Sequence, residues 1–404
     1  MSAIPAPLIT VDDALARLLD GVAALPGETL GFAAAHGRIL AADVIAKLTQ
    51  PPFAASAMDG YAIRWADRAG PWLLVGESAA GRRFAGEVGP GETVRILTGA
   101  PLPAGADTIV VQEDVARNGD SIILTCEGPP REGAHIRRAG LDFAAGEPVA
   151  RAGERVTPAR IGVTAAAGHA TLAVHRRPRV AILATGDELV PPGTVPGPGA
   201  IVSSNGVMLA ALLGAHAEII DGGIIIDDPA TLAAAIRAHQ DADVLVTIGG
   251  ASVGDHDHVL PVLRGLGAAI DFWRIALRPG KPMLAGRLGA TRIVGLPGNP
   301  VSAFVCATLF VVPLLRRLAG ELDPRPVMAK AAAGTALPAN GPRRDYLRAR
   351  LEDSVVTPAG RQDSAMLAVL AASNVLILRE AHAPELFVGD IVDCIVLDTI
   401  SGVA

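Results

Sequence analysis

The chain has 404 residues, of which 50% are hydrophobic and 19% charged, with a net charge of −6 at pH 7. Such a length exceeds one ordinary core and predicts several domains, and the scarcity of aromatic residues (3%) and of basic runs argues against nucleic-acid binding. The chain has three widely spaced cysteines, no signal pattern and no apolar run long enough to span a bilayer. These features predict a cytoplasmic protein outside the membrane.

The first 177 residues predict a mixed linking domain that is interrupted by a β-domain. Apolar residues recur at helical spacing over 8–25, after Thr10 as a candidate cap, and a second helix is predicted from Thr157 to about Gly168. From 51 to 139, short strands broken by Gly and Pro indicate a small β-barrel or sandwich. We therefore predict a discontinuous linking domain, 1–50 plus 140–177, with residues 51–139 inserted as the β-domain.

From 178 to 325 the chain alternates strands and helices in the way that a parallel α/β sheet requires. Residues 326–404 read as a small β-rich C-terminal domain. The predicted fold class is thus multidomain α/β, with a central parallel α/β domain. Ligands of such sheets bind beyond the carboxyl ends of the strands. Those predicted ends carry Gly186, Asp187, Glu188, Asp227, Asp228, Gly249, Gly250, Ser252, Asp255, Asp257 and Pro297 to Asn299.

The stretch 273–302 combines a basic turn with a helix start. Arg274, Arg278 and Lys281 surround Pro279-Gly280, a pair that favours a turn. Further on, Asn299 and Pro300 suit the cap and the first position of a long apolar helix. A helix start offers unpaired N–H groups and roughly half a positive charge, so this stretch predicts an oxyanion site. The alternative is a plain strand–turn–helix corner with solvated basic residues.

The other motifs each admit a structural explanation. The run Gly249 to Gly254 is a plausible phosphate cradle, although it is neither a Walker A loop nor a dinucleotide fingerprint. Asp228 before Pro229 is explained as a helix cap, and Asp59 and Thr98 as turn residues. A transition-metal site at His256 and His258 would lack a third ligand. The carboxylates that together suit Mg²⁺ are Glu188, Asp227, Asp228 and Asp257.

An ordered set of short motifs carries a resemblance that covers nearly the whole chain. The motifs are MDGYA (58–62), LTGAPLP (97–103), TGDEL (185–189), SSNG (203–206), GGASVG (249–254) with Asp255, His256 and Asp257, RPGKP (278–282) and GLPGNPVS (295–302). In this order they resemble the molybdopterin molybdenumtransferase family, which comprises MoeA-type proteins and the gephyrin E-domain. The resemblance implies a four-part protomer, a homodimer, and a cleft between the α/β domain of one subunit and the β-domain of the other.

The implied reaction takes adenylylated molybdopterin and molybdate as substrates, requires Mg²⁺, and yields AMP and molybdenum cofactor. By the resemblance, Glu188, Asp228 and Asp257 belong to the nucleotide–Mg²⁺ site, and Asp59 and Thr98 reach in from the other subunit. Asp142 matches a residue on the dimer side of the cleft. The positions matched to molybdate or pterin phosphate binding, together with the glycine cradle and the helix start, are Gly249, Gly250, Ser252, Arg274, Arg278, Lys281, Pro282, Asn299, Ser302, Arg348 and Ser364. The implied partners are the adenylyltransferase that precedes this step and the recipient molybdoenzymes.

The sequence departs from the family pattern in two places. Arg274 and Arg278 stand where lysines are frequent, and arginine offers a planar fork in place of a compact ammonium group. Ala368 and Val369 replace frequent serines. Two rival functions stay open: a molybdopterin adenylyltransferase, which would not need 1–177 or 325–404, and a non-catalytic scaffold, which would not need the charged cleft residues.

Overall fold

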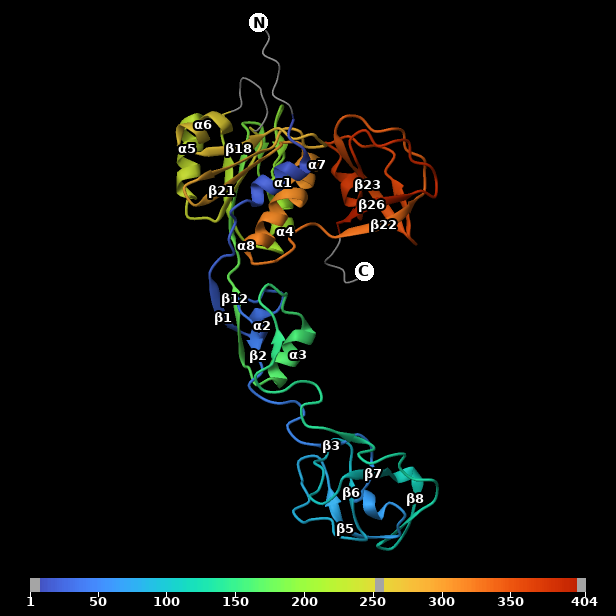
Figure 1. Cartoon of the computed structure of the whole chain (residues 1–404). Helices are drawn as coiled ribbons and strands as arrows, with labels where there is room; N and C mark the ends of the chain where they lie inside the picture. The colour runs from blue at the N-terminus through green and yellow to red at the C-terminus, as the bar shows by residue number, and fades with distance from the viewer. Residues whose placement is uncertain (1–7, 251–257, 398–404) are drawn as a thin grey trace. The chain divides into compact units, whose positions relative to one another are not determined.

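The computed structural model describes residues 8–250 and 258–397 (Figure 1). The chain divides into two compact units, one made of residues 1–28 and 175–404 and the other of residues 29–174. The sequence predicts that residues 1–50 belong to the linking domain. In the structure, the helix α1 (Val11–Leu19) packs with the α/β domain, because it buries Val11, Ala14 and Leu18 in the core of the first unit. Its cap is Thr10, whose hydroxyl accepts a hydrogen bond from the Asp13 N–H at 3.1 Å.

The centre of the first unit is a six-stranded sheet. Its strand order is β16 (Glu218–Ile225), β13 (Arg179–Thr185), β17 (Val244–Ile248), β21 (Thr291–Leu296), β20 (Leu284–Leu288) and β18 (Ala269–Trp273). The first four strands are parallel, whereas β20 and β18 each run antiparallel to the strand before them. The sequence predicts a parallel α/β sheet, and the structure adds an antiparallel edge to it, because two residues join β20 to β21 and only an antiparallel hairpin closes so short a loop.

Helices cover both faces of this sheet, and alternate residues of β13 show how. Val180 and Ile182 join the core formed with α1, α4 (Ser204–Gly214) and α7 (Pro300–Cys306). Ala181 and Leu183 point the other way and join the core formed with α5 (Pro229–Ala238) and α6 (Val259–Gly265). Figure 1 shows α5 and α6 on one side of the sheet and α1, α4 and α7 on the other. The period of two along a strand thus sets the layers.

One long apolar helix runs through the larger of these cores. It consists of α7, a π-helical turn (Ala307–Val311) and α8 (Val312–Leu318). Pro313 has no N–H to donate, and the hydrogen-bond pattern widens just before it. The stretch Pro300–Leu318 is long and apolar enough to cross a membrane, but 78% of it is buried inside the protein. It serves as a core helix of the α/β domain.

The C-terminal part of the first unit is a second six-stranded sheet. Its order is β19 (Leu277–Arg278), β23 (Arg344–Glu352), β24 (Val355–Pro358), β22 (Met328–Ala333), β26 (Ile391–Val396) and β25 (Val375–Arg379). Because β25 also pairs with β23, five of these strands close on themselves. The remaining strand, β19, comes from the α/β domain and pairs in parallel with β23. This pairing fixes the basic turn after β19 against the C-terminal domain.

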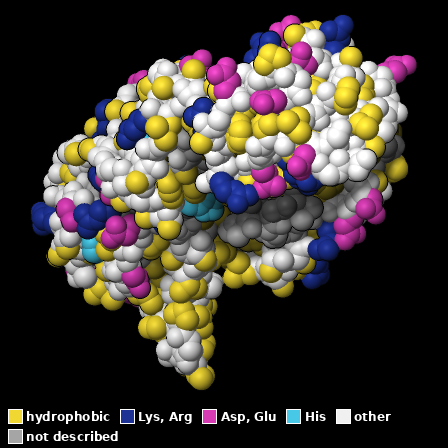
Figure 2. All heavy atoms as spheres, turned by 90° about the horizontal axis from the view of Figure 1, so that it is seen from below, with side chains coloured by type: hydrophobic (Ala, Val, Ile, Leu, Met, Phe, Trp, Pro, Cys, Tyr) yellow, Lys and Arg dark blue, Asp and Glu magenta, His cyan; other side chains and the backbone are white. Residues whose placement is uncertain are grey.

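The second unit holds another six-stranded sheet and a small helical part. The sheet order is β7 (Thr108–Val111), β4 (Gly60–Ile63), β6 (Glu92–Ile96), β5 (Trp72–Ser78), β9 (Ser121–Leu124) and β8 (Val115–Asn118). Its core includes Ile63, Trp72 and Val110. The helix α3 (Pro158–Ala166) starts at Pro158, and the Thr157 hydroxyl accepts from the Arg160 N–H at 3.3 Å. Figure 2 draws the whole chain from below, and basic and acidic side chains are interspersed on the face that it shows.

Candidate active site

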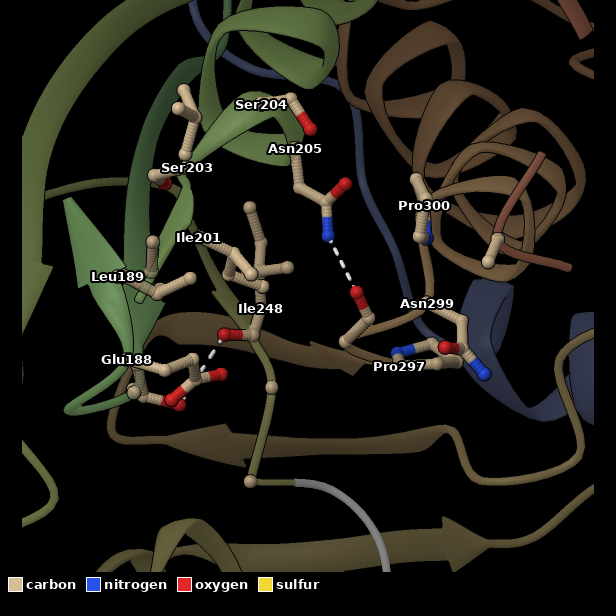
Figure 3. A pocket seen from close by; sticks show the side chains of 18 of the residues that line it. Glu188, Leu189, Ile201, Ser203, Ser204, Asn205, Ile248, Pro297, Asn299 and Pro300 are labelled. Carbon is tan, nitrogen blue, oxygen red and sulfur yellow. Dashed lines mark hydrogen bonds between the residues drawn. The ribbon is translucent and has the colours of Figure 1, made fainter. Parts of the chain in front are cut away.

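The carboxyl ends of β13, β17 and β21 open into a cavity of about 720 Å³. Both α4 and α7 begin at its edge, so two helix starts face it (Figure 3). Two residues of the C-terminal domain complete the wall. The residues around the cavity are Ala184 to Gly186, Glu188, Leu189, Ile201 to Asn205, Asp227, Ile248 to Gly250, Pro282, Pro297 to Pro300, Ala365 and Leu367.

Carboxylates from two strand ends gather on one side of this cavity. Glu188 follows β13 and Asp227 follows β16, and both line the cavity. The Asp227 N–H donates to the Asp187 carboxylate at 3.0 Å, which ties the two loops together. Partial burial raises the pKa of Asp227 above its ordinary value of 3.8, and the charges of Asp187 and Glu188 raise it further. This acidic rim therefore favours a bound cation.

Asp228 has a different setting from its neighbour. It is the N-cap of α5, and its carboxylate accepts from the Thr231 N–H at 2.7 Å and from the Thr231 hydroxyl at 2.8 Å. These two hydrogen bonds lower the pKa of Asp228. Asp228 does not line the cavity, whereas Asp227 does.

Three of the four predicted magnesium ligands, Glu188, Asp227 and Asp228, are among the described residues. Asp257 and Ser252 lie outside the described residues. Over 8–250 and 258–397, no three His, Cys, Asp or Glu side chains stand close enough together to hold a metal ion. The four-carboxylate set therefore stays a prediction, with Glu188 and Asp227 as its members that line the cavity.

Glycines form the floor of the cavity because no side chain fits there. Gly249 and Gly250 have φ values of +91° and +59°. A Cβ on Gly249 would stand 2.8 Å from the Thr185 carbonyl oxygen, and one on Gly250 would stand 2.5 Å from the Val259 side chain. A Cβ on Gly298 would lie 3.8 Å from the Gly249 Cα, so the β17 and β21 loops approach backbone to backbone. The floor consequently presents backbone groups to a ligand.

The three cations of the basic turn have separate surroundings. Arg274 has a positive φ of 73° and stacks on the Trp273 ring, with 4.2 Å from its guanidinium carbon to the ring centroid. Arg278 forms an ion pair with Asp345, a nearly buried residue at the start of β23. Lys281 is exposed and makes no ion pair with any residue that the structure describes. Of the turn, Pro282 is the residue that lines the cavity.

The basic turn rests directly on the long helix. Gly280 has a φ of +117°, and a Cβ there would stand 2.4 Å from the Cys306 sulfur. The Cys306 thiol donates to the Gly280 carbonyl at 3.5 Å. Pro282 and the residues Pro297 to Pro300 line the same cavity. The turn and the helix start predicted as an oxyanion site are therefore neighbours.

The start of α4 contributes Asn205, which is not among the predicted site residues. The Asn205 amide donates to the Gly298 carbonyl at 2.6 Å and so ties α4 to the loop before α7 (Figure 3). Its other side-chain atom, Oδ1, is buried without a hydrogen-bond partner among the described residues. The only sequence signal for it was the SSNG motif after a strand.

The start of α7 is partly occupied by the C-terminal domain. Asn299 is the cap residue, but its side chain makes no capping hydrogen bond. The Val301 N–H donates instead to the Ser364 carbonyl at 3.0 Å. Ser302 is 4% exposed. Ser364 therefore reaches this site through its backbone, and its neighbour Ala365 lines the cavity.

Arg348 lies behind the cavity wall and does not line it. It is 2% exposed, and its guanidinium donates to the carbonyls of Met366 at 3.2 Å and Arg361 at 3.4 Å. Burial lowers its pKa from the ordinary value.

The remaining predicted residues belong to the second unit. The Asp59 carboxylate accepts from the Thr98 N–H and the Thr98 hydroxyl, both at 2.7 Å, so these two predicted residues are neighbours. Those bonds lower the pKa of Asp59. Asp142 is exposed, and its N–H donates to the Gln50 carbonyl at 3.0 Å.

Comparison with known proteins finds relatives that match this chain over most of its length. Three family descriptions match in succession: MoeA N-terminal region (domain I and II) over residues 9–168, probable molybdopterin binding domain over 181–317, and MoeA C-terminal region (domain IV) over 330–397. A molybdopterin molybdenumtransferase of Haemophilus influenzae is 35% identical over 95% of this chain and 98% of its own. Molybdopterin molybdenumtransferase 2 of Mycobacterium tuberculosis is 39% identical over 86% of this chain and 90% of its own.

A crystal structure of the molybdopterin biosynthesis MoeA protein from Pyrococcus horikoshii has the same fold. It superposes with a TM-score of 0.81 at 28% identity, covering 96% of this chain and 100% of that one. The fold and site thus define a class of multidomain α/β proteins with a central domain of the molybdopterin-binding type, and the predicted fold class is confirmed. The chain belongs to the MoeA family.

Proposed function

We propose that this protein inserts molybdenum from molybdate into adenylylated molybdopterin and releases AMP, which completes the molybdenum cofactor. Family membership supports this reaction, since both relatives described above are named molybdopterin molybdenumtransferase. The observation that carries the proposal is a single cavity with an acidic rim, a glycine floor and a helix start beside a basic turn. A pyrophosphate-linked nucleotide needs the first two features, and a tetrahedral oxyanion needs the last.

In this proposal the acidic rim serves the nucleotide end. Glu188 and Asp227 supply hard oxygen ligands of the kind Mg²⁺ prefers, and burial, together with the charges of Asp187 and Glu188, raises the pKa of Asp227. Bound Mg²⁺ would neutralise the pyrophosphate oxygens during hydrolysis of the link that frees AMP. The glycine floor would let backbone N–H groups approach the phosphate oxygens.

The basic turn and the helix start serve the molybdate end. Arg278 pairs with Asp345 and Arg274 stacks on the Trp273 ring, whereas Lys281 makes neither kind of contact with the described residues and is therefore the cation of the turn most ready to pair with a new anion. Arg278 is held by Asp345 and acts mainly by shaping the turn. A doubly charged oxyanion at this place would gain from a fixed cation and from the helix dipole together.

The homodimer implied by the resemblance is likewise a proposal, as is the role of Asp59 and Thr98 of a second copy beside the nucleotide. Sedimentation analysis of the full chain tests it: a dimer is expected at micromolar concentration. A monomer that still turns over would contradict the shared site.

The assay that tests the function measures two products in parallel. AMP release from adenylylated molybdopterin is followed with and without molybdate, and ATP consumption is followed on molybdopterin. We expect AMP release that depends on molybdate and Mg²⁺, with no ATP consumption. ATP consumption without AMP release would favour the adenylyltransferase. The absence of both reactions would favour a scaffold.

A further inference from the structure

The side chain of Arg348 is buried, and the nearby Asp363 carboxylate acts on its charge without forming an ion pair with it. It is among the largest fully buried side chains of the described chain, yet no Asp or Glu of the described residues lies within ion-pair distance of it. A buried charge needs hydrogen bonds in place of the lost water. Arg348 obtains them from the segment 361–366, whose backbone carbonyls accept at both ends.

Gln362 completes this arrangement by bonding in both directions. Its side-chain oxygen accepts from the Arg348 N–H at 3.0 Å and from the Arg348 Nε at 3.3 Å. Its side-chain nitrogen donates to the carbonyls of Arg348 and Ala359, both at 2.9 Å. One exposed glutamine therefore uses both ends of its amide to hold the segment on β23.

The segment held in this way is also part of the cavity wall. Ser364 accepts the Val301 N–H in the first turn of α7, and Ala365 and Leu367 line the cavity. The segment is thus fixed at one end to the C-terminal sheet and at the other to the helix start proposed for molybdate. Any loosening on the C-terminal side moves the wall at the helix start.

We propose that Gln362 is a positioning residue, which holds Arg348 and the segment 361–366 so that the cavity wall stays docked on the start of α7. This inference rests on the proposed function only for its kinetic consequence. Its structural part concerns hydrogen bonds that can be followed in the absence of any substrate.

The test compares Gln362→Ala, Gln362→Glu and the control Gln240→Ala in the full chain. Gln240 is also exposed, but it lies between α5 and β17, at the amino ends of the strands. Gln362→Ala should speed hydrogen exchange at the Arg348 amide, which loses its acceptor, and at the Val301 amide, whose acceptor, the Ser364 carbonyl, is held less firmly. It should raise KM for molybdate about tenfold and change kcat less than about threefold.

The conservative variant and the control make the result specific. The carboxylate of Gln362→Glu still accepts from Arg348 and adds an opposite charge, but it cannot donate to the carbonyls of Arg348 and Ala359, so this variant should recover only part of the exchange protection and of the molybdate KM. Gln240→Ala should match the wild type in both. Unchanged exchange in Gln362→Ala would overturn the positioning role. Faster exchange with an unchanged molybdate KM would overturn its link to the site, while wild-type AMP release would leave the proposed function standing.

Discussion

Asp227 and Asp228 are adjacent in sequence, but their carboxylates have opposite surroundings. Hydrogen bonds from Thr231 stabilise the charge of Asp228, and burial beside Asp187 and Glu188 disfavours the charge of Asp227. The raised pKa means that folded Asp227 keeps its proton to a higher pH than the unfolded chain does. The protonation of Asp227 therefore contributes to the free energy of unfolding at low pH. This contribution is lost as pH rises from about 4 through the folded pKa.

Asp227→Asn removes this loss. We expect the variant to be more stable than the wild type at pH 7 in EDTA, and the difference to vanish below pH about 4, as measured by urea unfolding. Millimolar MgCl₂ should raise the Tm of the wild type more than that of the variant. AMP release should fall by about a hundredfold or more. An equal Mg²⁺ shift in both proteins would contradict the cation site.

For Asp228, two substitutions separate capping from charge. Serine is a good N-cap, so Asp228→Ser should keep the Tm close to that of the wild type, whereas Asp228→Ala should lower it. If Asp228 also acts at the nucleotide, as the resemblance implies, both variants lose AMP release. Full turnover by Asp228→Ser would restrict Asp228 to its capping role.

The location of the cavity can be predicted from the sequence. Gly, Asp and Glu residues follow the predicted strands, and parallel strands place their carboxyl ends at one edge of the sheet. The patterns do not reveal that Arg278 is engaged by Asp345 or that Asn205 ties α4 to Gly298, since both contacts join residues more than sixty positions apart. Arg348 is a further case, because a basic residue in a strand reads as exposed until the fold buries it.

At the scale of elements, the close packing of the basic turn on α7 depends on Gly280. Gly280→Ala would combine an unfavourable positive φ with a steric clash against Cys306. Gly289→Ala is the matched control, since Gly289 also has a positive φ (+61°) but nothing within 4 Å of an added Cβ.

Gly289→Ala should cost about 1 kcal/mol in the free energy of unfolding, and Gly280→Ala about 2 kcal/mol more. Thermal and urea unfolding measure the difference. Adding Cys306→Ala to Gly280→Ala should recover part of the steric cost. Equal destabilisation by the two glycine variants would show that the turn does not press on the helix.

Helices with strong capping signals begin where the sequence predicts. Thr157 with Pro158 and Asp228 with Pro229 start helices where the cap rules place them. The local sequence does not predict the antiparallel direction of β20 or the π-helical turn before Pro313. Both depend on the elements that pack around them.

At the scale of the whole molecule, the α/β and C-terminal domains of the first unit are joined by an ion pair. The Arg344 guanidinium donates to both Asp12 carboxylate oxygens at 2.8 Å each, and Asp12 lies in the first turn of α1. This pairing lowers the pKa of Asp12. It also explains why α1 belongs to this unit: its apolar face and its first-turn acid both have partners there.

Asp12→Asn should lower the free energy of unfolding at pH 7 by about 0.5 kcal/mol, a small value because the Asp12 side chain is 74% exposed. Since the folded pKa is lowered, this stabilisation is present above pH about 4 and is lost as pH falls through the folded pKa. Urea unfolding at several pH values measures it. A difference that survives in 1 M NaCl would point to lost packing instead of lost charge.

We expect one cavity to receive both the oxyanion and the nucleotide. Anomalous scattering from crystals soaked with molybdate and AMP tests it most directly. We expect a molybdenum peak between Lys281 and the start of α7, with AMP over the glycine floor beside Glu188 and Asp227. A molybdenum peak away from the carboxyl edge of the sheet, or none with AMP bound in the cavity, would contradict the account.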